Sequence, residues 1–508
     1  MKKYLSDNLP EQLYTAHDCR EIDNRVISSG EVAGYELMSR AGQFTFDCIC
    51  QQFSDIRHIV ILCGTGNNGG DGYIVAGLAA GRGIKVNVYA YGPPTTKDSI
   101  SAREYAQKMG SDIVDCLDRP NLSDTLKAAD LIVDALLGTG VDREVGGYLA
   151  EIINWVNNSN KPVVACDIPT GLNSDNGRVM GHCISAQATP TFIALKAGLF
   201  TGSGKAQSGC IQFSDLGVTA ENYSQTQPFA TLLNRRRLSL VVQERSEIAH
   251  KGTTGYAAII GGAPGMMGAV IMAASTAYRT GCGRVKVLTH TDHGSALALA
   301  CPEILTQECG EDTEILDRFS DFNTIAIGPG LGQTHWARHL FNQVMQSNLP
   351  MVIDADGLNL LSKDKNKCDH RVLTPHPGEA ARLLNCSTAD IQDNRYAAAK
   401  EIVSQYGGVC VLKGSGTLIA AQDHLTHVCR AGNSGQATAG MGDVLTGCIV
   451  GFVAQGYNLF DAACLGTWCH AKAADNIAQS SGKIGMMATD LLLPIQQLHN
   501  ELINAKTR

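Results

Sequence analysis

A small-residue loop with one acidic side chain, Asn433 to Gly447, has the composition of a phosphoryl-transfer site. The loop contains Gly440, Gly442 and Asp443, and the apolar segment 444–453 that follows predicts a buried helix. Backbone N–H groups at a helix start are free and partly positive, so they can hold a phosphate. An aspartate at this position can take the proton from an attacking hydroxyl. The window alone also allows an ordinary glycine loop in which Asp443 caps the helix.

Four other loops in the second half of the chain follow or precede predicted strands and are rich in glycine. They are Gly261 to Ala269, Gly328 to Gly332, Thr374 to Glu379 and Lys413 to Thr417. Together with the loop at Asp443 they predict a polar crevice lined by glycine, in which backbone amides and Lys413 neutralise phosphate charge.

The first half of the chain contains a second candidate phosphate loop, Gly64 to Asp71, directly after an apolar strand. The loop satisfies the G-x-G-x-x-G pattern, which is weak by itself. A dinucleotide-binding Rossmann unit also needs an acidic residue about 20 positions further on. No residue from Tyr73 to Lys97 is acidic, so the pattern argues against an ordinary dehydrogenase. A phosphate-binding loop and a bare structural turn both remain possible.

Two more strand ends in this half carry similar residues, the segments 134–144 and 167–171. In open parallel sheets the ligand lies outside the carboxyl ends of the strands. A single aspartate at such a place is usually a helix cap, but three loops rich in Gly, Asp, Thr or Asn predict one shared pocket.

The elements that must position these loops alternate between strands and helices in both halves. Such alternation predicts parallel sheets with helices on both faces, an α/β fold in two domains. The pattern is lost over 221–236, and we place a linker at 226–236 between domains 1–225 and 237–508. Helices are expected over 11–52, 73–80, 101–109, 148–156, 269–279, 444–455 and 461–478. Strands are expected at 58–63, 85–90, 130–134, 162–167, 189–195, 209–213, 256–260, 284–288, 324–327, 351–354, 371–373, 409–412, 417–421 and 427–429.

Composition excludes several classes of function. The 508 residues are 44% hydrophobic and 18% charged, as in a well-cored globular protein. A net charge of −8 gives no basic surface for nucleic acid or an anionic membrane, and no apolar run is long enough to span a bilayer. The start of the chain lacks the apolar core of a signal peptide, and the 18 scattered cysteines fit reduced thiols in the cytoplasm. We also expect a homo-oligomer, whose number of subunits the sequence does not set.

The motifs GTGNNGGDG, DALLGTG and DIPTGLNSD resemble the epimerase domain of the bifunctional NAD(P)HX repair enzymes. The resemblance implies an N-terminal Rossmann-like α/β/α sandwich that binds hydrated NAD(P)H, with Asp167 as the candidate acid/base. Lys196 is a second candidate, which either contacts substrate phosphates or is simply exposed. The implied hydrate-binding residues are Asn67, Asn68, Gly69, Gly70, Asp71, Gly138, Thr139, Gly140, Val141, Asp142, Arg143, Glu144, Asp167 and Lys196. A potassium ion is implied at Asn68, Asp134 and Thr170.

The loops of the second half, with His250-Lys-Gly252, resemble the ADP- or ATP-dependent NAD(P)HX dehydratases, a branch of the ribokinase-like α/β/α fold. The resemblance implies that Asp443 is catalytic and that Mg²⁺ takes part, with Glu379 suggested for its network. The implied hydrate-binding residues are Ala269, Gly330, His376 and Asp443. The implied nucleotide-binding residues are Lys413, Gly414, Ser415, Gly416, Thr417 and Gly442.

The implied activity is repair of nicotinamide nucleotides. One domain would epimerise the R and S forms of NADHX and NADPHX, and the other would dehydrate the S form with ADP, giving AMP and phosphate. The loops alone also allow a sugar or vitamin kinase with an accessory N-terminal domain, or a non-catalytic nucleotide-binding regulator. The fusion of two domains favours ADP over ATP. The sequence alone decides neither the choice of nucleotide nor the preference between NADHX and NADPHX.

Overall fold

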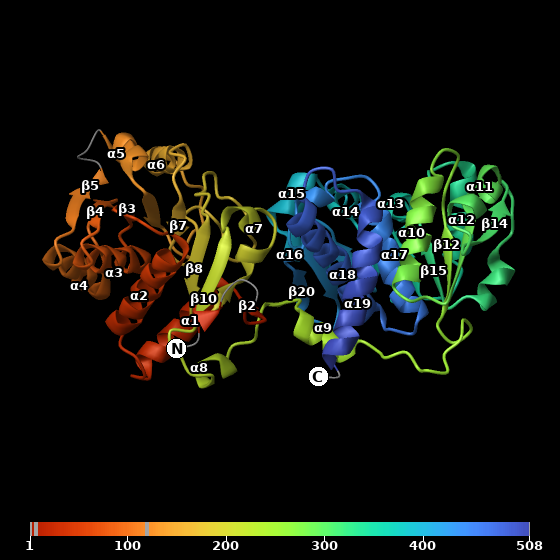
Figure 1. Ribbon diagram of the computed structural model, residues 1–508, viewed down its shortest axis with the longest axis horizontal. Helices are drawn as coiled ribbons and strands as arrows, with labels where there is room; N and C mark the ends of the chain where they lie inside the picture. The colour runs from red at the N-terminus through yellow and green to blue at the C-terminus, as the bar shows by residue number, and fades with distance from the viewer. Residues whose placement is uncertain (1–2, 5–8, 117–120, 507–508) are drawn as a thin grey trace. The chain divides into compact units, whose positions relative to one another are not determined.

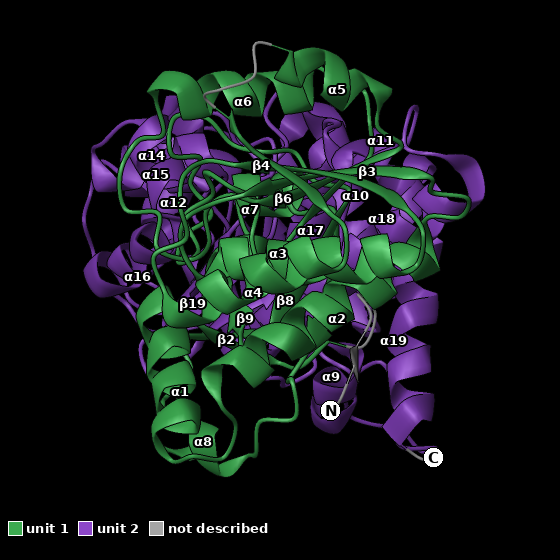
Figure 2. Cartoon of the chain, turned by 90° about the vertical axis from the view of Figure 1, so that its left-hand side faces the viewer, with its two compact units in different colours: residues 1–231 green, residues 232–508 purple. Residues whose placement is uncertain are grey.

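A mainly parallel β-sheet lies between layers of helices in each half of the chain, which confirms the predicted α/β class (Figure 1). The computed structural model describes residues 3–4, 9–116 and 121–506. The chain divides into two units, residues 1–231 and 232–508 (Figure 2). The segment 226–236, where we placed a linker, contains β11 (Ala230–Leu232) and the start of helix α9 (Arg235–Val241).

The sheet of the first unit has the strand order β1-β10-β8-β7-β6-β3-β4-β5, and every neighbouring pair except β1–β10 is parallel. The carboxyl ends of the parallel strands therefore lie along one edge of the sheet. The strands are β1 (Lys3–Tyr4), β3 (His58–Cys63), β4 (Lys85–Ala90), β5 (Asp112–Asp115), β6 (Leu131–Ala135), β7 (Val163–Ala165), β8 (Ala188–Phe192) and β10 (Cys210–Ser214). Outside this sheet, β2 (Gln12–Tyr14) pairs with β9 (Leu195–Lys196) and β11.

Alternate side chains of β3 enter two different cores, which explains why this strand is apolar throughout. Ile59 and Ile61 pack with the helices α2, α3 and α4, whereas Val60 and Leu62 pack with α5 and α6. Figure 1 shows these two helix groups on opposite faces of the sheet. The helices of this unit are α1 (Ala16–Ser28), α2 (Gly34–Gln52), α3 (Asn67–Gly81), α4 (Lys97–Lys108), α5 (Leu122–Ala128), α6 (Gly147–Asn157), α7 (Ser203–Gln207) and α8 (Glu221–Ser224).

The sheet of the second unit follows the order β14-β13-β12-β15-β16-β17-β18-β19-β20. It is parallel from β14 to β18 and ends in the predicted hairpin, because β19 and β20 are antiparallel to their neighbours. The strands are β12 (Tyr256–Ile260), β13 (Arg284–His290), β14 (Leu305–Cys309), β15 (Thr324–Ile327), β16 (Met351–Ile353), β17 (Arg371–Leu373), β18 (Val409–Leu412), β19 (Thr417–Ala421) and β20 (Thr426–Cys429).

Helices α10, α17, α18 and α19 cover one face of this sheet and share a core with it. Helices α12 and α16 contact β15 and β18 as part of the second helical layer. The remaining helices are α10 (Met267–Arg279), α11 (Gly294–Ala300), α12 (His335–Val344), α13 (Ala355–Leu361), α14 (Pro377–Leu384), α15 (Thr388–Asp393), α16 (Arg395–Tyr406), α17 (Met441–Ala454), α18 (Leu459–Ser481) and α19 (Leu492–Lys506). Within the described residues, no helix combines the length and the apolar character needed to cross a membrane.

Several predicted elements begin or end at other residues in the structure, and two of these differences have a plain physical reason. Residues 12–14 form strand β2 instead of helix, and the first helix begins only at Ala16, after the Thr15 side chain caps it. Helix α17 begins at Met441, earlier than the expected residue 444, because Gly440 in the left-handed conformation serves as its N-cap. Asp443 therefore lies in the first turn of the helix.

Candidate active sites

The loops after β3 and β6 of the first unit lie in direct contact, as the strand-end rule predicts. Gly64 N–H donates to the Ala135 carbonyl at 2.9 Å, and a Cβ on Gly64 would lie only 1.8 Å from the Leu136 carbonyl oxygen. Only glycine can occupy this position. A Cβ on Gly138 would lie 3.3 Å from the Asn68 Cβ, so the second loop also packs against the start of α3.

A buried carboxylate, Asp134, organises the end of β6. Its Oδ1 accepts a hydrogen bond from the Thr170 hydroxyl at 2.7 Å, and its Oδ2 accepts one from the Thr170 backbone N–H at 2.8 Å. The same hydroxyl accepts from Leu137 N–H at 2.9 Å. The segments 134–138 and 167–171 are thereby held together, so two of the residues implied for potassium are adjacent.

The third of these residues, Asn68, has a buried amide whose nitrogen and oxygen have no hydrogen-bond partner in the part of the chain that the structure describes. Burial raises the pKa of the Asp134 carboxyl to about 6, although bonds from Thr170 and Leu136 oppose the rise. Within the described part of the chain no cationic side chain pairs with Asp134. A buried carboxylate without a counter-ion, together with an unsatisfied amide and a hydroxyl, has the hard oxygen donors that fit an alkali cation.

Asp167 and Lys196 form a buried ion pair. The ammonium also donates to the Thr191 hydroxyl at 3.1 Å and to the Phe192 carbonyl at 3.0 Å. Burial by itself lowers the pKa of Lys196, but Asp167 outweighs it and the pKa lies above its ordinary value. The alternative of an exposed lysine is wrong, because the side chain is 3% exposed. Asp167 itself has φ of 66°, a strained conformation of the kind found at functional sites.

Two further carboxylates face this ion pair. Burial, together with the charges of Asp167 and Asp23, raises the pKa of Asp71 well above its ordinary value. Burial also raises the pKa of Asp23 to about 7, with Lys196 opposing the rise. Asp71 is the last residue of the predicted glycine loop, whereas Asp23 comes from α1 and lies in no motif of the sequence.

The other residues implied for the hydrate lie in the two loops. Asn67 Oδ1 accepts from the Thr96 hydroxyl at 2.6 Å, and Gly69 and Gly70 are buried in the first turn of α3. The loop after Gly138 lies at the surface, where Glu144 pairs with Arg178 at 2.9 Å. The exposed or half-buried members of this loop are Thr139, Gly140, Val141, Asp142, Arg143 and Glu144.

In the second unit, Asp443 lies at the third position of α17, among the free N–H groups of the first turn. The capping alternative is wrong, because Gly440 is the N-cap and no side chain caps this helix. Burial and the charge of Asp354 raise the pKa of Asp443 to about 7, while Lys413 lowers it. No described donor forms a hydrogen bond to the Asp443 carboxylate. It can therefore accept a proton from a substrate at neutral pH.

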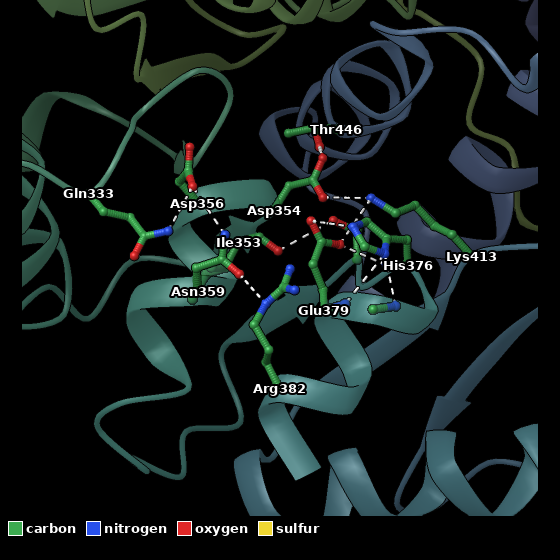
Figure 3. Close-up of polar contacts among 12 residues, drawn as sticks. Gln333, Ile353, Asp354, Asp356, Asn359, His376, Glu379, Arg382, Lys413 and Thr446 are labelled. Carbon is green, nitrogen blue, oxygen red and sulfur yellow. Dashed lines mark hydrogen bonds and ion pairs between the residues drawn. The ribbon is translucent and has the colours of Figure 1, made fainter. Parts of the chain in front are cut away.

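The Lys413 ammonium lies among acidic groups from different elements (Figure 3). It donates to Asp354 Oδ1 at 2.8 Å and lies 3.6 Å from Glu379 Oε2. Burial alone lowers the pKa of Lys413, but Asp354 and Glu379 raise it above its ordinary value. A Cβ on Gly442 would lie 3.5 Å from the ammonium, so this lysine is directly beside the start of α17.

His376 and Glu379 form a capping box at the start of α14. The Glu379 carboxylate accepts from the His376 backbone N–H at 2.7 Å, and the His376 Nδ1 accepts from Gly378 N–H at 2.9 Å. Burial lowers the pKa of the His376 imidazole, which is half-exposed and whose Nε2 lies 3.4 Å from Glu379 Oε1. Glu379 is thus committed to the helix cap and to Lys413. The described residues contain no cluster of three or more His, Cys, Asp or Glu side chains arranged to hold a metal ion.

Ala269 and Gly330, both implied for the hydrate, are also neighbours. Gly330 has φ of 57°, and a Cβ added there would lie 3.2 Å from the Ala269 Cβ. Helix α10, which carries Ala269, packs against α17. A Cβ on Gly440 would lie 2.6 Å from Met272 Sδ, so the start of α17 lies beside the second turn of α10.

The segment Lys413 to Thr417 forms the tight connection between β18 and β19. The Thr417 hydroxyl donates to the Gly414 carbonyl at 3.1 Å, and Ser415 is exposed while Gly416 is buried. The buried Arg395 donates to the carbonyls of Leu412 and Lys413 at 3.1 and 3.2 Å. Arg395 therefore holds the strand end from which Lys413 projects, although it lies in no motif that marked it beforehand.

The second site has the parts of a phosphoryl-transfer centre: a proton acceptor in a helix's first turn, a buried lysine and glycine loops. Residues 34–198 match the family model described as "YjeF-related protein N-terminus", and residues 257–497 match that of "NAD(P)H-hydrate dehydratase". A solved ribokinase-like superfamily protein from Enterococcus faecalis is 25% identical, with a TM-score of 0.50, covering 53% of this chain and 95% of its own. The class is therefore a ribokinase-like α/β domain with an additional α/β domain before it.

Two relatives align with nearly the whole chain. The bifunctional NAD(P)H-hydrate repair enzyme of Escherichia coli (strain K12) is 39% identical over 506 residues, 98% of this chain and 96% of that protein. The enzyme of the same description from Coxiella burnetii is 38% identical over 488 residues, 96% of this chain and 99% of that protein. The chain belongs to the family of bifunctional NAD(P)H-hydrate repair enzymes.

Proposed function

We propose that the chain restores hydrated NAD(P)H in two steps at two sites. The first unit interconverts the R and S epimers of NADHX and NADPHX. The second unit dehydrates the S form with consumption of ADP, giving NAD(P)H, AMP and phosphate. The observation that carries the proposal is the Asp443 carboxylate in the first turn of α17, with its pKa at about 7 and Lys413 beside it.

Asp443 is the base of the dehydration. The hydrate bears a hydroxyl on the ring carbon next to the nicotinamide nitrogen, and hydroxide is a poor leaving group. Asp443 accepts the proton of this hydroxyl, whose oxygen attacks the terminal phosphorus of ADP and displaces AMP. The phosphorylated carbon then loses inorganic phosphate as the ring nitrogen donates its electron pair, and loss of a ring proton gives NAD(P)H. The transferred phosphate thus serves as a leaving group.

The backbone amides at Gly440 to Gly442 and the Lys413 ammonium stabilise the charge of the transferring phosphate. The site needs more positive charge than it has, because Lys413 already faces Asp354 and Glu379. A Mg²⁺ ion that enters with ADP would supply the missing charge. The described residues contain no cluster of three or more His, Cys, Asp or Glu side chains that would hold it alone.

Epimerisation takes place at the ion pair of Asp167 and Lys196, where Asp167 acts as the acid/base. Asn68, Asp134 and Thr170 would hold a potassium ion at the neighbouring strand ends. The ion would supply positive charge beside the loops that receive the anionic dinucleotide. Three acceptors hold the Lys196 ammonium in the interior. Its role is therefore to orient Asp167 and to donate a hydrogen bond to the Asp167 carboxylate.

The proposal is tested by mixing the protein with NADHX, Mg²⁺ and ADP. We expect recovery of the NADH absorbance band, with one AMP and one phosphate formed for each NADH. A small-molecule kinase of the same fold would instead accumulate a stable phosphorylated product from a vitamin or sugar, and a regulator would consume no nucleotide. Either result would overturn the assignment.

A further inference from the structure

We propose that Asp354, which the reaction above does not use, is a positioning residue that fixes Lys413 against the helix carrying Asp443. The inference rests on the proposed dehydratase function and adds a residue to its machinery. Asp354 follows directly after β16 and is 1% exposed.

The Asp354 carboxylate bridges two elements of the site. One oxygen accepts from the Lys413 ammonium at 2.8 Å, and the other accepts from the Thr446 hydroxyl at 2.7 Å. Thr446 is fully buried and lies three residues after Asp443, on the same face of α17. The lysine that neutralises phosphate and the helix that carries the base are therefore tied to one carboxylate.

The carboxylate is not needed for the ordinary structural role of an aspartate at this position. Asp354 is the N-cap residue of α13, where an aspartate normally accepts a bond from the second or third helical N–H. Here the side chain caps nothing in α13 and turns toward Lys413 and Thr446 instead. A Cβ on Gly442 would lie 3.4 Å from the Asp354 oxygen, so the bridge runs directly beneath the first turn of α17.

The charges around Asp443 allow this role to be measured. Asp354 raises the pKa of Asp443 together with burial, and Lys413 lowers it. Glu379 faces Lys413 from α14, with His376 on its far side. His470 of α18 is uncharged at neutral pH, because burial lowers its pKa to about 4. Asp354 is thus the negative charge that, with burial, raises the pKa of the base.

The test compares Asp354→Asn with Thr446→Val in single-turnover dehydration of NADHX by ADP and Mg²⁺ over a range of pH. Asparagine keeps the shape and the bond to Thr446 but removes the charge. We expect the maximal rate to fall about 100-fold, because the lysine is no longer fixed. We also expect the acidic limb of the pH profile, which reports Asp443, to move to lower pH. Thr446→Val removes the hydrogen bond between α17 and Asp354 but keeps the charges of Asp354 and Lys413. The rate of this variant should therefore fall, while its acidic limb stays in place.

An Asp354→Asn variant with the wild-type rate and pH profile would overturn the inference, as would equal shifts of the acidic limb in both variants. A fall in the rate of Asp354→Asn with an unmoved acidic limb would also contradict the inference, because a merely structural defect would lower the rate without moving the limb. If wild-type protein fails to convert NADHX with ADP, the proposed function fails instead, so the two failures are distinguishable.

Discussion

At the scale of single residues, burial acts on two carboxylates of the second site in different ways because their partners differ. Asp354 has a depressed pKa although burial opposes it, since Lys413 and Thr446 bind its charged form. Asp443, with Lys413 close but no hydrogen-bond donor, has a pKa of about 7. Asp354 thus holds a negative charge, whereas Asp443 can accept a proton.

Asn68 provides a residue-scale prediction for the cation site. Asn68→Ala removes a buried amide that has no hydrogen-bond partner among the described residues, so without potassium the variant should be as stable as wild type or up to about 2 kcal/mol more stable. With potassium the order should reverse, because the variant loses a ligand oxygen. Thermal unfolding in potassium and in lithium chloride, together with the rate of epimerisation, measures both effects.

The exposed Asn154 of α6 gives the matched control, and Asn154→Ala should respond to potassium as wild type does. Equal potassium-induced stabilisation in Asn68→Ala and wild type would contradict the cation site.

The sequence predicted where reactive loops lie better than which side chains act within them. Parallel strands place their carboxyl ends at one edge, so loops such as Gly64 to Asp71 could be assigned to a pocket. Asp354 could not be assigned to the pocket from the sequence, because a single aspartate after a strand is indistinguishable from a helix cap. Lys196 was ambiguous for a similar reason: lysine is usually exposed, and only the tertiary fold buries it against Asp167.

At the scale of elements, strand bounds were predicted closely where the apolar runs are continuous. The predictions for β3, β4, β12, β15 and β18 match the structure to the residue. Half-exposed edge strands such as β5 and β14 were missed, because their polar residues break the apolar run. Helix starts were predicted less well, and α17 begins three residues before its apolar run because glycine sets its first turn.

Gly440 provides the element-scale prediction. Gly440→Ala forces an alanine into φ of 90° and brings its Cβ to 2.6 Å from Met272 Sδ. The unfolding free energy should fall by at least about 1 kcal/mol. The dehydration rate should fall as well, because the first turn must move relative to Lys413. Denaturant unfolding and the NADHX assay measure the two effects separately.

Gly456, just beyond the other end of α17, is the matched control. It also has φ of 90°, but a Cβ there would meet nothing within 4 Å. Gly456→Ala should therefore lose about the same stability without losing dehydration rate. Equal loss of rate in both variants would show that general destabilisation, and not the position of the first turn, lowers the activity.

At the scale of the whole molecule, each unit has its own sheet, its own core and its own acidic site. A site that attacks ADP with a hydroxyl on one face of the nicotinamide ring accepts one epimer. A second site that interconverts the epimers makes the whole pool available to the first. Two activities in one chain follow from the stereochemistry of the substrate.

The two activities are assigned to separate residues, and one experiment separates them. Asp443→Asn and Asp167→Asn proteins are each mixed with both epimers of NADHX, Mg²⁺ and ADP, while NADH absorbance and the epimer ratio are followed. Asp443→Asn should lower dehydration by about 1,000-fold or more and leave epimerisation intact. Asp167→Asn should convert the S epimer at the wild-type rate and leave the R epimer behind. Full dehydration by Asp443→Asn, or loss of both activities in either correctly folded variant, would contradict the account.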